Sequence, residues 1–189
     1  MADVQLTAFE HILLGLICLT PSSGYDLKRR FAASPLGVYQ PSSGALYPAL
    51  RRLERKGLVR THAVDDGAVR LGRPRYVYEP TQLGAAANKS WLRAPVEPAT
   101  AARDLGLHLM RFVLMEHVLA PAEVLGFLRG LADAMAAFTA GLERHAAALS
   151  PGGGHPRLAL DHGLAVHRAS LAWTEQTIAA LSAAPARAP

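Results

Sequence analysis

The sequence predicts a mainly α-helical protein with one small β-hairpin. Three observations support this fold class. Apolar residues recur with helical spacing over most of the chain. β-prone residues flank a turn signal, Asp65-Asp66-Gly67, between residues 58 and 79. Two narrow apolar stripes with heptad spacing run through the second half, which is typical of helices that pack on other helices.

Composition excludes several classes of protein. The chain has 189 residues, half of them hydrophobic, which is enough for one domain with a good core or for two small ones. Its single cysteine, Cys18, allows no disulfide framework and no thiolate pair for a metal. The longest apolar region, residues 105–119, contains charged residues and is shorter than a membrane span, and the N-terminus lacks the basic start of a signal peptide. We therefore expect a cytoplasmic protein that contacts no membrane.

Charge is distributed unevenly between the two halves. Residues 1–93 contain 13 basic and 7 acidic side chains, a net charge of +6, whereas residues 94–189 contain 7 and 8, a net charge of −1. This asymmetry indicates a module that faces nucleic acid, followed by a neutral module with another task. We expect a DNA-binding domain at 1–93, a linker at 94–98 with two prolines, and an α-helical dimerisation domain at 99–189.

The first half begins with three predicted helices. Thr7 starts a capping box with Glu10, and an apolar run follows it. A second Ser-x-x-Asp start signal predicts a helix at about residues 24 to 33. The third helix is expected from Ser43, because Pro48 is tolerable only if it lies in or near the first turn.

A hairpin and a fourth helix complete the first half. One strand is predicted at residues 58–64, a returning strand at 75–79, and a basic tip at 69–74 between them. Thr81 then starts another helix. Three helices followed by a hairpin are the arrangement of a winged helix-turn-helix domain, in which the third helix enters the major groove and the hairpin is the wing.

The third predicted helix has two chemically different faces. Leucines at 46, 50 and 53 suit a core, whereas Tyr47, Arg51 and Arg55 recur every four residues on another face. The arginines can reach guanine edges or phosphates, while Arg52 suits either a DNA contact or a solvated surface. The helix N-terminus and the wing add further candidates. The predicted DNA-binding residues are Ser43, Tyr47, Arg51, Arg52, Arg55, Arg70, Arg73 and Arg75.

The second half is predicted to be helical at 99–119, 121–149 and 157–184, with a flexible loop at 150–156. The last two segments carry heptad seams, whose partner is the other seam, the same seam of a second subunit, or both. We favour a homodimer, because one helix-turn-helix covers only one short half-site. The predicted dimerisation residues are Val124, Leu128, Leu131, Met135, Phe138, Leu142, Leu164, Leu171, Trp173 and Ile178.

Catalytic and ligand-binding alternatives are weaker. Six histidines lie in the second half, but neither His-x-x-x-His nor Gly-x-Ser-x-Gly spacing occurs. We therefore predict no enzyme, no cofactor and no metal site. A small apolar or aromatic effector could bind among the aromatic residues of this half. The candidate effector-binding residues are Phe112, Phe127 and Trp173, although such residues also suit plain core.

Several spaced motifs resemble the PadR-type transcriptional regulators. They are HILLGLICLTPSSGYDLKRRF, SSGALYPALRRLERKGLV and GRPRYVYEPTQLG, which extend over roughly residues 6 to 92. The second half is similar to the longer PadR subgroup, whose C-terminal helices resemble those of virulence-gene activators, at Pro-x-Glu (121–123) and Leu-x-Trp-x-Glu (171–175). One departure is Pro80-Thr81-Gln82-Leu83-Gly84, where the family usually has Leu-Thr-Glu-x-Gly, so a shorter second strand and a weaker helix cap are expected.

The resemblance implies a homodimer that controls a nearby gene, commonly as a repressor released by a small molecule. The predicted function is therefore a ligand-responsive repressor that binds double-stranded DNA at an inverted repeat. The alternative is a helical interaction module whose winged domain binds protein and not DNA.

Overall fold

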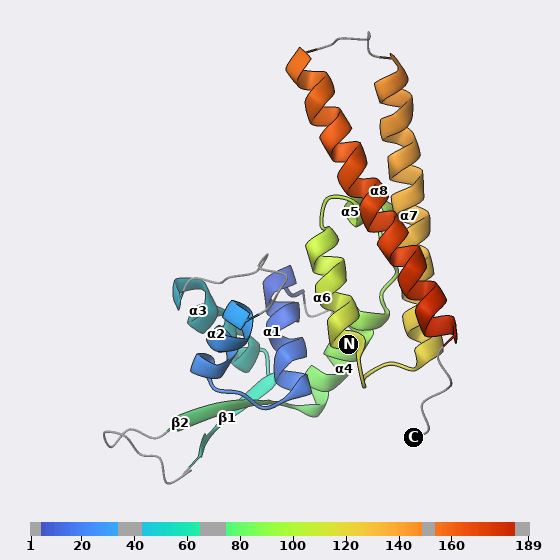
Figure 1. Ribbon diagram of the computed structural model, residues 1–189. Coiled ribbons are helices and arrows are strands. Elements are labelled where there is room, and N and C mark those ends of the chain that lie inside the picture. The colour runs from blue at the N-terminus through green and yellow to red at the C-terminus, as the bar shows by residue number, and fades with distance from the viewer. Residues whose placement is uncertain (1–4, 34–42, 65–74, 149–153, 184–189) are drawn as a thin grey trace. The chain divides into compact units, whose positions relative to one another are not determined.

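The computed structural model describes residues 5–33, 43–64, 75–148 and 154–183 of the protein (Figure 1). The chain divides into two compact units, one made of Met1–Ala94 and Leu109–Val118, the other of Pro95–His108 and Leu119–Pro189. We call them unit 1 and unit 2. Along the chain, unit 1 gives way to unit 2 after Ala94, at the start of the predicted linker. Leu109–Val118, which was expected in the helical half, belongs to unit 1. The division of tasks between the two halves stays a prediction.

The first two helices of unit 1 start at the predicted capping signals. α1 (Ala8–Leu19) begins after Thr7, whose hydroxyl accepts from the Glu10 amide at 3.2 Å, while the Glu10 carboxylate accepts from the Thr7 amide at 2.9 Å. α2 (Gly24–Ala33) follows the same pattern, because the Asp26 carboxylate accepts from the Ser23 amide at 3.1 Å. Both predicted starts are confirmed, since these side chains satisfy amides that have no partner inside the helix.

The third helix, α3 (Ser43–Arg55), begins where the proline requires but still contains Pro48 in its second turn. A proline there has no amide to donate to the carbonyl four residues earlier. The helix ends at Arg55, and Gly57, which follows it, has a φ of 67°, the left-handed conformation that favours glycine. The Gly57 amide donates to the Glu54 carbonyl at 2.8 Å and the Leu58 amide to the Leu53 carbonyl at 3.0 Å, which is a Schellman motif.

The two strands form the predicted hairpin. β1 (Val59–Val64) pairs antiparallel with β2 (Arg75–Pro80), with Val59 opposite Pro80. Pro80 therefore does not shorten the second strand. An isolated bridge between Ser22 and Tyr78, with amide-to-carbonyl distances of 3.0 Å in both directions, joins β2 to the segment before α2. The predicted turn and basic tip at 65–74 lie outside the described residues.

The fourth helix, α4 (Gln82–Arg93), is capped without the acid that the family pattern leads one to expect. The Thr81 hydroxyl accepts from the Gly84 amide at 3.0 Å. It also lies 2.6 Å from the Gly57 carbonyl, to which it donates. Thr81 thus connects the start of α4 to the end of α3.

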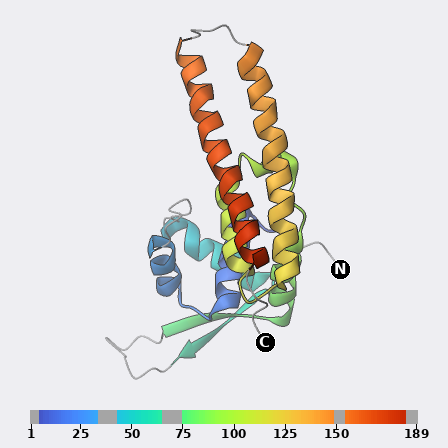
Figure 2. The same ribbon diagram turned by 45° about the vertical axis from the view of Figure 1, so that its right-hand side comes forward.

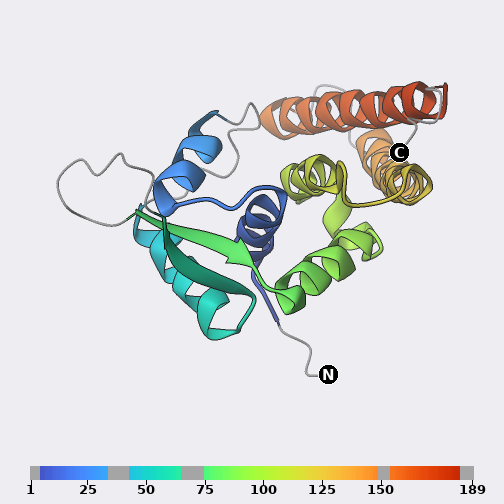
Figure 3. The ribbon, with the colours of Figure 1, turned by 90° about the horizontal axis from the view of Figure 1, so that it is seen from below.

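The core of unit 1 is built around α1. Six of its twelve residues are buried, on several sides of the helix. The helices α2, α3 and α4 and the hairpin lie around α1 (Figure 3). Each of them supplies apolar side chains to this core. The fully buried large side chains of unit 1 are Ile12, Leu13, Leu14, Ile17, Leu27, Leu46, Leu50, Leu53, Leu58, Leu92, Leu114 and Met115. The buried side chains of α3 and of the hairpin therefore fix both elements on the core of unit 1.

The single helix predicted at 99–119 is wrong. The segment forms α5 (Pro98–Ala101) and α6 (Leu105–Met115), separated by a turn. The Asp104 carbonyl accepts from the amides of Leu107 and His108 at 2.9 and 3.2 Å, so a new helix starts there. Aspartate favours the start of a helix over its interior, which explains the break.

Unit 2 consists mainly of two long antiparallel helices. α7 (Pro121–Ala148) and α8 (Gly154–Ala183) lie side by side in both views (Figures 1 and 2). The last helix starts at Gly154, three residues before the predicted start at Arg157. Residues 150–153 of the predicted loop lie outside the described residues. The α7–α8 pair has the arrangement expected of two heptad seams joined by a short connection.

By length and mean hydropathy, α7 would also suit a membrane span. This observation is weak evidence for a membrane, because a core helix of a soluble protein has the same properties. α7 also carries five charged residues, Glu123, Arg129, Asp133, Glu143 and Arg144. α7 packs along α8, and Leu128, Leu131 and Met135 are among its buried residues.

Candidate nucleic-acid interface

The recognition surface is built on α3, whose two predicted faces are present. Leu46, Leu50 and Leu53 are buried against the core. Tyr47 keeps 46% of its surface exposed, and Arg51 and Arg55 are exposed beside it. We call Tyr47, Arg51 and Arg55 the outer face of α3. Ser43 belongs to the helix, but its side chain lies outside the described residues.

Tyr47 is held against the start of α2. A Cβ atom on Gly24 would lie 2.8 Å from the Tyr47 Cε1 atom, so only glycine leaves room for the ring in this position. The tyrosine therefore lies between the two helices of the helix-turn-helix and remains exposed. Any larger residue at position 24 would displace the ring, because contacts shorter than about 3 Å are repulsive for carbon atoms.

Tyr78 of β2 extends the same surface from the wing side. Burial raises the pKa of the Tyr78 phenol, and the nearby charge of Glu54 and the Tyr47 phenol raise it further, whereas Arg51 lowers it. These influences show that the phenol lies close to the outer face of α3. The Glu54 carboxylate also accepts from the Thr61 hydroxyl of β1 at 2.5 Å. The wing strand β1 therefore contacts α3.

The predicted wing contacts are only partly visible. Arg70 and Arg73 lie outside the described residues, and for Arg75 only the backbone, at the start of β2, is described. Two exposed tyrosines were missed as candidates: Tyr25 at the start of α2 and Tyr76 of β2, which keep 69% and 55% of their surface exposed. Their sequence signal is weak, since an isolated tyrosine suits a core as well as a surface.

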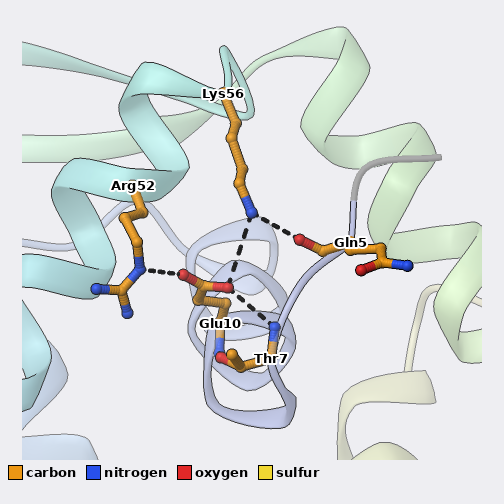
Figure 4. A network of polar contacts seen from close by, with 5 residues as sticks. All are labelled: Gln5, Thr7, Glu10, Arg52 and Lys56. Atoms are coloured by element: carbon orange, nitrogen blue, oxygen red, sulfur yellow. Dashed lines mark hydrogen bonds and ion pairs between the residues drawn. The ribbon is translucent and has the colours of Figure 1, made fainter. Parts of the chain in front are cut away.

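Arg52 and Lys56, on another side of α3, have partners inside the domain. The Arg52 Nε donates to a Glu10 carboxylate oxygen at 2.5 Å (Figure 4). The Lys56 Nζ donates to the Gln5 carbonyl at 2.6 Å and lies 4.0 Å from the other Glu10 oxygen. Sequence reasoning identified Glu10 only as part of a capping box, because its partners on and next to α3 lie more than 40 residues away.

A partly buried polar cluster lies where α6 meets the end of α4. The Arg111 guanidinium of α6 donates to the carbonyls of Trp91 and Leu92 at 3.1 Å and also to that of Ala94. It therefore satisfies the end of α4. Burial lowers the pKa of Arg111 to about 10. The Trp91 ring, 5.6 Å from the guanidinium carbon, also stacks on the His11 ring at 4.7 Å.

The predicted dimerisation residues fall into two groups. Leu128, Leu131, Met135 and Leu164 are buried within the single chain. Their burial therefore does not require a second subunit. Val124, Leu142, Leu171 and Ile178 are partly exposed, and Phe138 and Trp173 are exposed by 41% and 38%. The Phe138 ring contacts the His167 ring edge-on at 4.9 Å, where α7 meets α8.

The candidate effector residues are divided between the units. Phe112 belongs to unit 1, whereas Phe127 and Trp173 belong to unit 2. Phe127 is buried and tilted against His108 at a ring distance of 6.2 Å. An effector site shared by all three residues stays a prediction.

α2 packs against α3, the wing contacts α3, and an exposed face of α3 carries tyrosine and arginine. This arrangement defines a winged helix-turn-helix domain. Residues 13–90 match the model of the transcriptional regulator PadR-like family. The winged helix-turn-helix part of the chain is thus similar to a family of transcriptional regulators.

Individual relatives share only 20–32% sequence identity with the chain. The probable transcriptional regulator Rv1176c of Mycobacterium tuberculosis is 32% identical over 101 residues, which cover 53% of this chain and 51% of the relative. The chain thus spans about half of the length of this relative. Among solved structures, Bacillus subtilis PadR in complex with operator DNA is 20% identical with a TM-score of 0.44 and covers 93% of this chain and 99% of its own. The PadR-like regulator BC1756 of Bacillus cereus is 20% identical with a TM-score of 0.43 and covers 96% and 99%. At these scores the structural likeness carries no functional argument.

Proposed function

We propose that this PadR-like regulator binds double-stranded DNA as a homodimer and represses transcription from an inverted-repeat operator. The observation that carries the proposal is the outer face of α3, where Tyr47, Arg51 and Arg55 are exposed while the leucine face is fully buried. Exposed arginines on such a helix can donate two hydrogen bonds to a guanine edge or pair with phosphates. A regulator of this kind would act in the cytoplasm.

Electrostatics supports a polyanionic partner. Residues 1–93, which contain the outer face of α3 and the wing, carry a net charge of +6, whereas residues 94–189 carry −1. Each phosphate that a protein cation neutralises releases condensed counterions, so affinity falls steeply with salt concentration. We propose Ser43, Tyr47, Arg51 and Arg55 as contacts of α3, and Arg70, Arg73 and Arg75 as contacts of the wing.

The homodimer is supported by the second side of α8. Leu158, Val166 and Trp173 are exposed and, at about 100° per residue, share one side of this helix. Leu164 and Thr174, its buried residues, lie on the other side. Exposed apolar residues along one side of a long helix favour a helical partner. A second copy of this chain is the partner we propose, because two-fold symmetry would supply the second half-site.

Ligand response is the least supported part of the proposal. It is based on the aromatic residues Phe112, Phe127 and Trp173, which suit a small apolar or aromatic effector. A screen of such compounds by tryptophan fluorescence tests it. A compound that quenches Trp173 fluorescence in the wild type, and not in Trp173→Phe, and that releases DNA would support this part.

The DNA proposal is tested by fluorescence anisotropy with a labelled duplex from upstream of the chain's own gene. The wild type should form a salt-sensitive complex, and Tyr47→Ala together with Arg51→Ala should weaken it by about 100-fold or more, since each good base contact contributes about 1–3 kcal/mol. Arg129→Ala, which removes an exposed arginine of α7, should leave binding unchanged. Binding that persists in the double variant would favour a protein-binding role for the winged domain.

A further inference from the structure

Glu10 is a nearly buried carboxylate inside the DNA-binding unit. Its side chain is only 3% exposed, although it lies in the first turn of α1. A buried ionised group is costly unless it is paired and hydrogen-bonded. Here each oxygen has a donor: one accepts from the Arg52 Nε at 2.5 Å, the other from the Thr7 amide at 2.9 Å (Figure 4).

The carboxylate remains ionised in this environment. Burial raises the pKa of Glu10, but the hydrogen bonds from Arg52 and the Thr7 amide, together with the charge of Lys56, lower it below its ordinary value in total. Glu10 therefore attracts both cations at neutral pH. Arg52 and Lys56 are four residues apart, at the C-terminal end of α3, so both approach α1 from the same side.

Lys56 makes a second contact in the same place. Its ammonium donates to the Gln5 carbonyl at 2.6 Å, in the extended segment that leads into α1. The end of α3 is thus attached to the start of α1 at three points (Figure 4). The leucines of α3 fix its depth in the core, but an apolar face alone permits a small rotation about the helix axis. A directional, charge-assisted pair opposes that rotation.

Rotation of α3 would matter for DNA. Arg52 follows Arg51 directly in the chain, so their side chains leave the helix about 100° apart. While Arg52 is held by Glu10, Arg51 points away from α1, on the outer face. A small rotation would move Tyr47 and Arg51 relative to base edges, for which a displacement of about 1 Å is enough to lose a hydrogen bond.

We propose that Glu10 is a positioning residue of the DNA interface and acts on DNA through Arg52 and Lys56. The inference rests on the proposed DNA-binding function. It assigns Arg52 to the attachment of α3 and not to direct base or phosphate contact. Arg52 was predicted as a DNA contact because the sequence alone does not reveal its buried partner.

The sign of the charge change separates this proposal from a purely electrostatic effect. Glu10→Gln raises the net charge by one, and a more positive protein binds DNA more tightly in the absence of other effects. Positioning predicts the opposite for the specific duplex: affinity falls on the order of tenfold, comparable to the loss of about one base contact. Affinity for a duplex of the same composition in shuffled order stays equal or rises.

The experiment measures both duplexes by anisotropy over a range of salt concentrations, with the full chain. Glu116→Gln, an exposed carboxylate of the same unit, is the matched charge control and should not reduce the ratio of specific to shuffled affinity. Arg52→Met should lower the ratio like Glu10→Gln, and the double variant should lower it no further, because both changes remove one interaction. Arg52→Lys keeps a cation beside Glu10 and should retain most of the ratio.

Other outcomes overturn the proposal in distinct ways. If Arg52→Met reduces the salt slope by about one and weakens both duplexes equally, Arg52 is a phosphate contact. If Glu10→Gln binds both duplexes like the wild type, Glu10 has only a structural role. If the wild type itself forms no salt-sensitive complex, the proposed function fails together with this inference. Thermal unfolding of each variant identifies any loss of folding, and Arg52→Met, whose side chain is 41% exposed, then carries the test if Glu10→Gln does not fold.

Discussion

The helices α1 and α8 bury their side chains very differently. α1 has twelve residues, six of them buried, including a charged one. α8 has thirty residues, and only Leu164 and Thr174 are buried. A helix surrounded by other elements contributes to the core on several sides, whereas a helix packed along one neighbour does so along one stripe. Unit 1 therefore has an apolar core of its own, whereas α8 has an exposed apolar side that suits a partner.

The largest effect should come from truncating a fully buried leucine side chain in the core of unit 1. Leu50→Ala should lower the free energy of unfolding by about 3–4 kcal/mol, because the side chain is fully buried and leaves a cavity. The same substitution at Leu158 of α8, which is 65% exposed, should cost less than about 0.5 kcal/mol in the monomer. Urea unfolding at several protein concentrations checks both. Equal losses at low concentration would contradict the difference between the two regions.

The second prediction concerns His11, the partly buried histidine of α1. Burial lowers the pKa of His11 to about 4, against about 6.5 in the unfolded chain, and its Nδ1 has no hydrogen-bond partner among the described residues. Between these values the unfolded chain binds the proton and the folded chain does not. Stability is therefore full above about pH 6.5 and falls as the pH decreases toward 4, by about 2 kcal/mol between pH 7 and 4.5.

His11→Phe should remove this pH dependence while keeping the stack on Trp91. Urea unfolding at pH 7.0, 6.0, 5.0 and 4.5 compares the variant with the wild type. His145→Gln, at an exposed position of unit 2, is the control substitution. A variant slope equal to that of the wild type would show that His11 is protonated in the folded chain.

The third prediction tests the exposed apolar side of α8. Trp173→Ala should weaken the proposed homodimer by about 2 kcal/mol, or about 30-fold in the dissociation constant, because large aromatic residues contribute strongly to interfaces. Sedimentation velocity over a range of concentrations measures the change. A wild type that remains a folded monomer at micromolar concentration would remove the homodimer from the proposed function.

The smallest effect is expected at a surface ion pair between α7 and α8. Arg168 of α8 donates to the Glu143 carboxylate of α7 at 2.6 Å, but both side chains are about half exposed. Exposed pairs contribute only about 0.2–1 kcal/mol, so Arg168→Ala should lower stability by about 0.5 kcal/mol at low salt and less at high salt. The variant also serves as the control for Trp173→Ala on the same helix. A loss above 2 kcal/mol would mean that the pair is far less solvated than its exposure indicates.

Local signals predicted much of unit 1. Thr7, Ser23 and Thr81 cap helices as expected, and the Gly57 stop signal forms a Schellman motif. Such signals act between neighbouring residues, so they can be recognised in one sequence. The break at Asp104 was missed because apolar spacing continues across it, and only the actual hydrogen bonds of Thr100 and Asp104 show where one helix ends and the next begins.

The sequence by itself determined the order of the elements from α1 to α4 and the two faces of α3, because periodicity and capping are local properties of the chain. It also carried the charge asymmetry and the motifs of the PadR-like family. Only the tertiary structure decided that Arg52 is paired with Glu10 and that Arg111 binds the end of α4. These contacts join residues 42 and 20 positions apart, respectively, and the folded core alone brings them within hydrogen-bonding distance.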